Sequence, residues 1–141
     1  MVNISNIVVA TDFSTAAREA LPAALAMAKN FGAKIHLVHV VEDNTFADQT
    51  YYFGFGMPTG KLEELVKARM KRLEKEVHGI AQEVPYDTHL RRGNPASEIV
   101  GAAKDLDADL VVLATHGRTG LAHLLLGSVA ERVVRECPCP V

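Results

Sequence analysis

The 141-residue chain has few cysteines, no apolar run of membrane-spanning length and no excess of basic residues. A membrane-crossing helix needs ~20 consecutive apolar residues, and no stretch approaches that length. The formal net charge of -2 argues against a nucleic-acid binder held by a basic surface. The N-terminal residues lack the basic region and apolar block of a signal peptide. We therefore expect a cytoplasmic protein that engages neither membrane nor nucleic acid.

The two cysteines, Cys137 and Cys139, lie near the C-terminus with one residue between them. This spacing gives poor disulfide geometry in an extended segment. Two cysteines are also too few for a structural zinc site. We expect buried thiols near the start of a strand.

Apolar patterns divide the chain into alternating strands and helices. Short β-branched or apolar runs predict strands over residues 6–11, 34–41, 86–90 and 110–115. Apolar stripes at helical spacing predict helices over about 14–30, 62–80, 95–106 and 129–135. The strict alternation predicts an α/β fold: one open parallel sheet with helices on both faces, formed as a single domain by residues 1–141.

Capping signals sharpen several helix ends. Ser14 is the expected N-cap of the first helix and Gly32 its C-terminal glycine, while Pro22 should kink or loosen it. Asn94 is the expected cap of the third helix, with Pro95 at its first position. The first helix should bury one face, formed by Ala17, Leu21, Ala24, Leu25 and Ala28. The second should bury a stripe formed by Leu62, Leu65, Val66, Met70, Leu73, Val77 and Ile80.

Two segments interrupt this regular order. Residues 42–58 form a long connection that holds five of the eight aromatic residues, and a lid over a ligand and a dimer contact are equally plausible roles. At the other end, a fifth strand would begin after Pro140, just before the last residue, Val141. We expect that final strand to be truncated or absent, and the sequence alone does not decide between these.

The most informative stretch runs from Ala114 to Ser128. It connects a predicted buried strand to a helix start and is bracketed by glycines. Helix N-termini attract anions, and glycines allow the backbone to approach a phosphate closely. The stretch therefore predicts a phosphorylated ligand, most simply a nucleotide. Ser128 and Glu131 also fit a capping box, and on pattern alone the two roles are about even.

Asp12 is the expected partner of this glycine loop. It follows the first strand, and the carboxyl ends of neighbouring parallel strands flank the usual ligand crevice. Asp12 could instead simply cap the first helix in place of Ser14. A P-loop and a Rossmann glycine motif are both absent, and no serine–histidine–acid or paired-carboxylate set stands out. A strong hydrolase is therefore not indicated.

The histidines carry weaker signals. His36 and His39 lie three apart in a strand, so they should face opposite sides and not share a metal. His116 lies in the loop and could touch a phosphate or simply bond the backbone, whereas His123 is expected on the surface. Arg118 could grip phosphate oxygens or lie on the surface.

The chain resembles the universal stress protein family over nearly its full length. The matching segments are Ile7–Ser14, Leu37–Val40, Gly93–Ile99, Ala108–Leu113 and Thr115–Glu131. The family's nucleotide-binding pattern is G-x2-G-x9-G-[ST]. Gly117, Gly127 and Ser128 match its end, with nine residues between the glycines, and Ala114 stands at the first glycine.

The resemblance implies a flavodoxin- or Rossmann-like sheet of strand order 3-2-1-4(-5) and a bound adenine nucleotide, ATP with Mg²⁺. It implies that Asp12 and Val40 lie near the adenosine, and that Gly117, Gly127, Ser128 and Val129 hold ribose and phosphates. The full set of expected binding residues is Ala10, Thr11, Asp12, Val40, Leu113, Ala114, His116, Gly117, Arg118, Gly127, Ser128 and Val129.

The resulting hypothesis is an ATP-binding stress-response protein that acts as a nucleotide-dependent switch or sensor. We expect a homodimer, because family members often pair their last strands, and a further protein partner of unknown identity. Two alternatives stay open. One is a slow Mg-dependent ATPase that uses Asp12 and His116, and the other is an interaction module that no longer binds nucleotide, which Ala114 favours.

Overall fold

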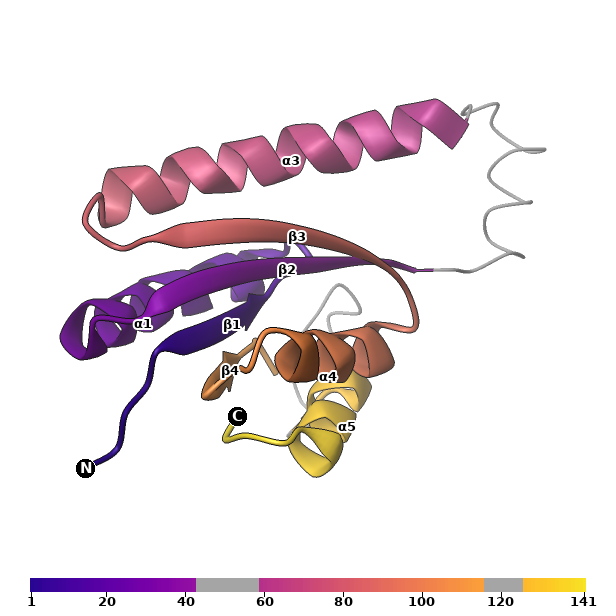
Figure 1. The fold of residues 1–141 in the computed structure, drawn as a ribbon. Coiled ribbons are helices and arrows are strands. Elements are labelled where there is room, and N and C mark those ends of the chain that lie inside the picture. The colour runs from indigo at the N-terminus through magenta and orange to yellow at the C-terminus, as the bar shows by residue number, and fades with distance from the viewer. Residues whose placement is uncertain (43–58, 116–125) are drawn as a thin grey trace.

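A computed structural model describes residues 1–42, 59–115 and 126–141 of the chain. These residues form four strands and four helices in strict alternation (Figure 1). In chain order the elements are β1 (Asn6–Ala10), α1 (Thr15–Phe31), β2 (Lys34–Glu42), α3 (Thr59–Ile80), β3 (Tyr86–Gly93), α4 (Pro95–Asp105), β4 (Leu110–Val112) and α5 (Ser128–Glu136).

The strands form one parallel sheet in the order β3-β2-β1-β4, which confirms the expected fold class and order. The order reverses at β1, which lies between β2 and β4. Val8 of β1 pairs with His36 on one side and with Val111 on the other. The carboxyl ends of β1 and β4 therefore lie side by side, as a crevice at the switch point requires.

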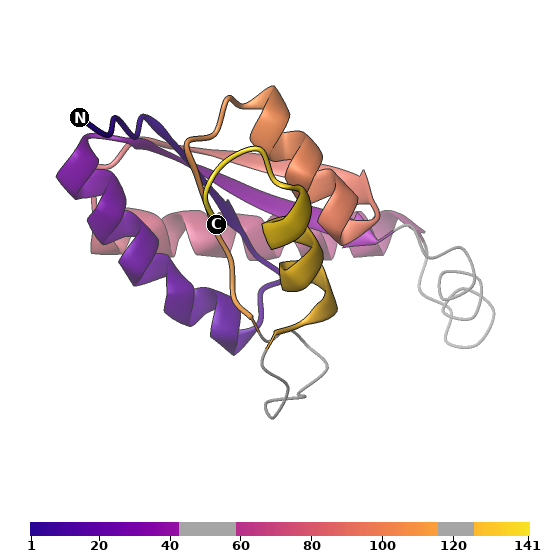
Figure 2. The ribbon, with the colours of Figure 1, turned by 90° about the horizontal axis from the view of Figure 1, so that it is seen from below.

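Helices cover both faces of the sheet, with α1 and α3 on one side and α4 and α5 on the other (Figures 1 and 2). Successive side chains of β1 point to opposite faces. Ile7 and Val9 belong to the core shared with α1 and α3, whereas Val8 and Ala10 belong to the core shared with α4 and α5. Both faces of β1 are thus buried, which explains its continuous apolar sequence.

Helix α1 follows the sequence prediction closely. Its buried residues are the five expected ones, Ala17, Leu21, Ala24, Leu25 and Ala28. Ser14 Oγ accepts a hydrogen bond from the Ala17 N–H at 3.2 Å, and Gly32 ends the helix at φ 66°. The helix is continuous through Pro22, which is exposed, so the proline does not break the element.

Helix α3 corrects two members of the predicted stripe, and the side chain of a third, Leu62, lies outside what the structure describes. Val66, Met70, Leu73 and Val77 are buried against the sheet, as expected. Leu65 and Ile80 were expected on the same face but are 39% and 54% exposed. Leu65 directly precedes Val66 and therefore lies about 100° around the helix from the buried face, and Ile80 is the last residue of α3.

Each of the four strands ends at a different residue from the predicted one, β1 and β2 by one residue and β3 and β4 by three. β4 ends at Val112 instead of Thr115 because it pairs only with Ile7 to Val9 of β1, and β1 ends at Ala10. β3 continues to Gly93 instead of Leu90, because β2 offers it a partner as far as Glu42. Tertiary pairing therefore sets the lengths of β3 and β4. Glu42 belongs to β2, and the rest of the expected aromatic connection, residues 43–58, lies outside the described residues.

The residues after α5 lie against the edge of the sheet beside β4. The Val111 N–H donates to the Pro140 carbonyl at 2.9 Å. Cys137 and Cys139 pack against the α4–α5 core as free thiols, but both are half-buried, which corrects the expectation of full burial. None of the helices in the described parts of the chain has the length and apolarity that a membrane span requires.

Candidate functional site

The turn after β1 has an unusual backbone. Phe13 has φ 63°, a left-handed conformation that costs a bulky side chain about 1–2 kcal/mol. Hydrogen bonds hold the turn: the Thr11 N–H donates to the Val38 carbonyl at 2.9 Å, and Thr11 Oγ1 accepts from the Phe13 N–H at 3.0 Å. Asp12 Oδ1 accepts from the Ser14 N–H at 2.9 Å. Backbone strain at a strand end is typical of ligand sites.

His39 and Phe13 support this turn, and the sequence reasoning assigned neither to the site. His39 is 7% exposed, and its Nδ1 lies 2.7 Å from the Thr11 carbonyl, to which it donates. The Phe13 ring packs on the His39 ring with centroids 4.4 Å apart. In the sequence, only the place of His39 within a predicted strand was evident, and this did not indicate a role in supporting the turn. Its role is to fix the position of Thr11 and, through it, Asp12.

The start of α5 lies against the end of β4. Gly127 is the N-cap, and its N–H donates to the Thr115 carbonyl at 2.9 Å. A Cβ on Gly127 would lie 2.7 Å from that carbonyl oxygen, so only glycine fits here. The capping-box alternative is wrong: Ser128 is the first helical residue, the N-cap has no side chain, and Glu131 pairs with Arg135. The helix therefore begins without a side-chain cap.

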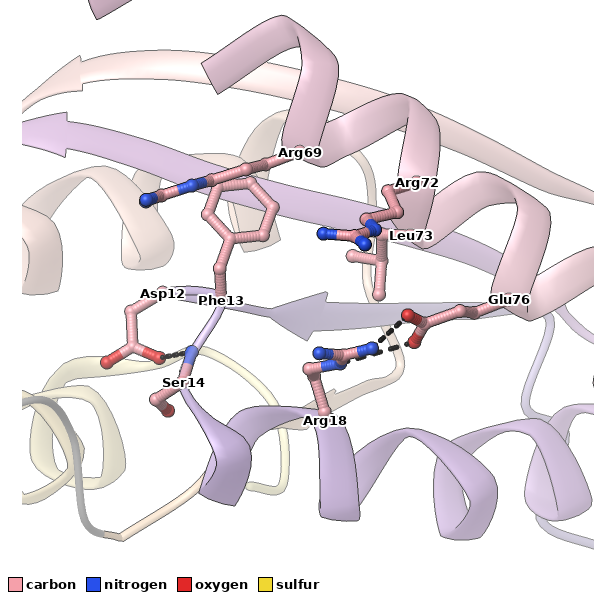
Figure 3. Close-up of a pocket in the computed structure, with 8 residues that line it drawn as sticks. All are labelled: Asp12, Phe13, Ser14, Arg18, Arg69, Arg72, Leu73 and Glu76. Atoms are coloured by element: carbon pink, nitrogen blue, oxygen red, sulfur yellow. Dashed lines mark hydrogen bonds and ion pairs between the residues drawn. The ribbon is translucent and has the colours of Figure 1, made fainter. Parts of the chain in front are cut away.

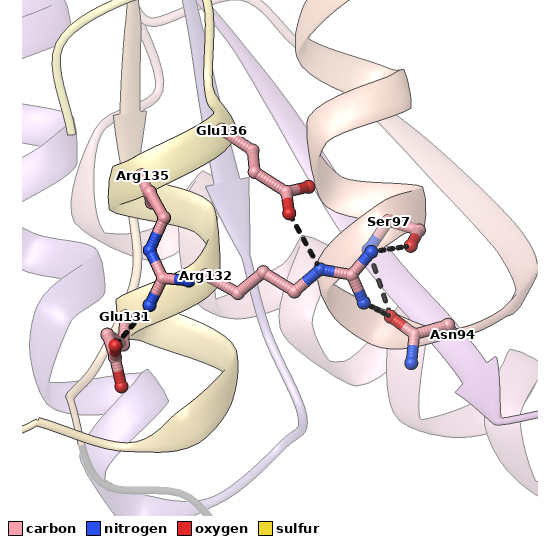
Figure 4. A network of polar contacts seen from close by, with 6 residues as sticks. All are labelled: Asn94, Ser97, Glu131, Arg132, Arg135 and Glu136. Atoms are coloured by element: carbon pink, nitrogen blue, oxygen red, sulfur yellow. Dashed lines mark hydrogen bonds and ion pairs between the residues drawn. The ribbon is translucent and has the colours of Figure 1, made fainter.

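Arg132 fixes α5 to the start of α4 (Figure 4). Its guanidinium donates to Asn94 Oδ1 at 3.1 Å, to Ser97 Oγ at 2.9 Å and to Glu136 Oε1 at 3.0 Å. Asn94 Oδ1 also caps α4 by accepting from the Ser97 N–H, as the sequence predicted. The orientation of α5 is thus set by a network that lies outside the crevice.

Four of the apolar residues expected in the site meet on one face of the sheet. Ala10 is a buried member of the α4–α5 core, and Val40, Leu113 and Val129 are half-buried against it. They come from β1, β2, the end of β4 and the first turn of α5. Ala114, at the first glycine position of the motif, is also half-buried. The structure therefore places these predicted residues near the carboxyl ends of the strands.

A hollow of about 380 Å³ lies beside Asp12, between α1 and α3 (Figure 3). It is lined by Asp12, Phe13, Ser14, Arg18, Arg69, Arg72, Leu73 and Glu76. Arg18 forms an ion pair with Glu76 across the hollow. Arg69 and Arg72 reach it from α3 and were not expected near the site, because nothing in their local sequence indicates contact with α1. They give this side of Asp12 a positive character.

Three expected site residues, His116, Gly117 and Arg118, lie outside the described residues, as does His123. The structure therefore describes one wall of the expected crevice from β1, β2 and β4, and the other from α5. Asp12 and Thr115 follow the carboxyl ends of β1 and β4, and the hydrogen bond from Gly127 to Thr115 holds the start of α5 beside them.

His36 and His39 point to opposite faces of the sheet, as predicted. His39 packs with Phe13 of the α1–α3 core, whereas His36 contacts His89 and Asn6 on the other face. Burial, followed by the nearby His89 and Lys34, lowers the pKa of His36 below its ordinary value, despite an opposing effect of Asp87. The lowered pKa favours the neutral form of His36.

Comparison with known families supplies the decisive observation. The model of the universal stress protein family matches residues 3–141. The chain belongs to the universal stress protein family. A universal stress protein of Methanocaldococcus jannaschii is 40% identical to it over 141 residues, covering 96% of this chain and 78% of that protein.

Solved structures of the family share the fold. The universal stress protein UspA from Lactobacillus plantarum has a TM-score of 0.82 and 26% identity, over 100% of this chain and 97% of that chain. A universal stress protein solved in complex with cAMP has a TM-score of 0.72 and 22% identity, over 99% and 95% of the two chains. The second likeness is one of fold alone. The resemblance seen in the sequence is thus confirmed at the level of family and fold.

Proposed function

We propose that this universal stress protein binds an adenine nucleotide, ATP together with Mg²⁺, at the carboxyl edge of β1 and β4. The observation that carries the proposal is the start of α5, which has no side-chain cap and is held against β4 by the hydrogen bond from Gly127 to Thr115. A helix N-terminus with about half a positive charge stabilises phosphate oxygens. Asp12 lies at the end of the neighbouring strand.

The proposed roles follow from position. Gly127, Ser128 and Val129 would hold the phosphates and ribose through the first turn of α5, together with Gly117, Arg118 and His116 of the preceding loop. Asp12 would face the ribose or the Mg²⁺ ion. The half-buried side chains of Val40 and Leu113, with the strand end at Ala10, Thr11 and Ala114, would border the adenosine.

We further propose that the protein is a nucleotide-dependent switch in the stress response. Nucleotide at the start of α5 would change the surface that α5 and α4 share, since Arg132 joins these two helices. A second copy of the chain and an unidentified protein are the expected readers of that surface. Membership in the universal stress protein family supports the proposed role as a switch. If the protein hydrolyses ATP slowly, Asp12 is the residue that we expect to be required.

The experiment is calorimetric titration of the full chain with ATP, GTP and cAMP in the presence of Mg²⁺. Ser128→Asp places a carboxylate in the first turn of α5, where it stabilises the helix but repels phosphate. We expect wild type to bind ATP, and Ser128→Asp to lose binding without losing stability. A folded wild type that binds none of the three nucleotides would overturn the proposal and favour the interaction module.

The matched control is Ser97→Asp. Ser97 is exposed in the first turn of α4, where an aspartate can keep the acceptor for Arg132. It adds the same charge at another helix start, so equal loss of ATP binding in Ser97→Asp would show a nonspecific charge effect. Asp12→Asn keeps an acceptor for the Ser14 N–H and removes only the charge. Turnover measured as phosphate release and lost in Asp12→Asn would mark a slow ATPase.

A further inference from the structure

A second cluster of polar side chains lies toward the amino ends of the strands, away from the proposed nucleotide site. The β2–β3 register pairs His36 with Asp87 and Val38 with His89. Because alternate residues share a face, His36, Asp87 and His89 point to the same side of the sheet. One nitrogen of each histidine and one carboxylate oxygen all lie within 4.8 Å of one another.

Asn6 orients the ring of His36. His36 Nδ1 lies 3.1 Å from His89 Nε2, and His36 Nε2 lies 3.1 Å from Asn6 Oδ1. An amide oxygen only accepts hydrogen bonds, so the proton of His36 is on Nε2 and its lone pair is on Nδ1, directed at His89. Metal-bound histidines are typically held in this way, with the second ring N–H donated to a fixed acceptor.

We infer that His36, Asp87 and His89 form a binding site for a divalent transition-metal ion of the zinc type. Two nitrogens bound to tetrahedral zinc lie about 3.3 Å apart, as follows from zinc–nitrogen distances of about 2.0–2.1 Å. His36 and His89 present nitrogens at 3.1 Å, which is near that value. Ions in this class favour imidazole ligands, whereas Mg²⁺ and Ca²⁺ favour oxygen.

The three residues of the cluster differ in solvent exposure, as expected for a metal site that is open to water on one side. His36 is 6% exposed, His89 is half-buried and Asp87 is exposed. The two imidazoles are therefore fixed by the sheet, while the carboxylate side is open to solvent. Water would complete the coordination there. A bound ion would join β2 to β3 and would stabilise the folded chain by an amount that grows with the logarithm of the free ion concentration once this exceeds the dissociation constant.

Lys34 competes for this site. Its ammonium lies 2.5 Å from Asp87 Oδ2, so one carboxylate oxygen is engaged by a cation already. A carboxylate has two oxygens, and Asp87 can hold Lys34 on one and a metal ion on the other. The positive charge of Lys34 still opposes a second cation nearby. Removing it should therefore strengthen metal binding, an effect opposite in sign to loss of a ligand.

The test is titration of the chelator-treated full chain with Zn²⁺, followed by calorimetry, and with Co²⁺, followed by its visible absorption. We expect one ion per chain and tetrahedral Co²⁺ bands. His89→Gln and Asp87→Asn should weaken binding by more than the ~10–100-fold typical of losing an outer-shell partner. Lys34→Gln should strengthen it several-fold. Asp87 is exposed, so Asp87→Asn keeps the test decisive even if His89→Gln folds poorly.

The matched control is His78→Gln, which removes an exposed imidazole from the end of α3. It should leave Zn²⁺ affinity unchanged. Absence of a stoichiometric ion in wild type would reduce the cluster to a hydrogen-bonded histidine pair and overturn the inference. Equal weakening by His78→Gln and His89→Gln would do the same, as would weaker binding in Lys34→Gln.

Discussion

The two ends of the central strands are built from different chemical groups. At the carboxyl edge, the turn after β1 and the start of α5 are shaped by backbone contacts, such as the Gly127 N–H on the Thr115 carbonyl and the left-handed Phe13. At the amino edge, side chains make the contacts, with His36, Asp87 and His89 gathered on one face. The proposed ligands differ accordingly, an anionic nucleotide at the carboxyl edge and a metal cation at the amino edge.

The difference follows from the direction of the parallel strands. Helices begin at the carboxyl edge and present their N-terminal N–H groups there, so negative ligands are stabilised without charged side chains. No helix of the described residues begins at the amino edge, and recognition there depends on which residues the register places side by side. A parallel sheet can thus hold two sites of opposite preference that share no residue.

Gly127→Ala should have the largest effect on the carboxyl edge. The added Cβ would meet the Thr115 oxygen at 2.7 Å, and relieving that clash means moving the Thr115 backbone away from the start of α5. We expect a loss of about 1–3 kcal/mol in the free energy of unfolding, the usual cost of overpacking. Denaturant unfolding of the two proteins measures it.

Gly79→Ala is the matched control, since a Cβ at that helical position meets no atom within 4 Å. It should leave stability unchanged or raise it by up to about 1 kcal/mol. Equal destabilisation by the two changes would contradict the close-approach role of Gly127.

Much of this fold was predictable because it is local. The α1 face follows from helical periodicity, and the Ser14, Gly32 and Asn94 caps follow from their own side chains or from the lack of one. The strand order was predicted from the family resemblance. The helix face and the caps depend on residues close together in the sequence, whereas the strand order does not.

Two of the features that the sequence did not predict depend on residues far apart in the sequence. His36 and His89 are 53 residues apart, and only the β2–β3 register brings them together. Arg69 and Arg72 reach Asp12 only because α3 packs beside α1. The left-handed Phe13 has no sequence signature, since bulky residues rarely adopt it. The capping box failed by one position, because Gly127 takes the cap that Ser128 was expected to take.

The next prediction concerns the reactivity of the Cys139 thiol, which packs against the α4–α5 core. Burial, and then Cys137, raises the pKa of the Cys139 thiol to about 11. A raised thiol pKa means that the reactive thiolate is scarce at neutral pH. In the wild-type chain, with the modified cysteine identified by mass spectrometry, we expect alkylation of Cys139 by iodoacetamide at pH 8 to be about a hundredfold slower than for a thiol with pKa 9.0, and to rise toward pH 11. Reaction at the rate of an ordinary thiol would contradict this.

Asp109 should give the smallest effect, in the acid range. Its Oδ2 accepts from the Ser5 N–H at 2.7 Å and from the Asn6 N–H at 3.0 Å, and these bonds lower the pKa of the carboxyl below 3.8. A lowered folded pKa gives stability that is present above 3.8 and is lost as pH falls through the lower folded value.

Thermal unfolding of wild type and Asp109→Asn from pH 7 to pH 2 measures this contribution. The two melting temperatures should differ most at neutral pH and converge in strong acid. A difference that stays constant over the whole range would exclude the charge of Asp109 as its source.

The most direct test of two sites with opposite preference is amide NMR of the full chain, titrated separately with ATP and Mg²⁺ and with Zn²⁺. We predict that the nucleotide shifts amides of residues 11–14 and 127–130, at the carboxyl edge. Zn²⁺ should shift those around His36, Asp87 and His89, and the two sets should not overlap. Nucleotide-induced shifts centred on the histidine cluster, or a single set of amides that responds to both ligands, would contradict the account.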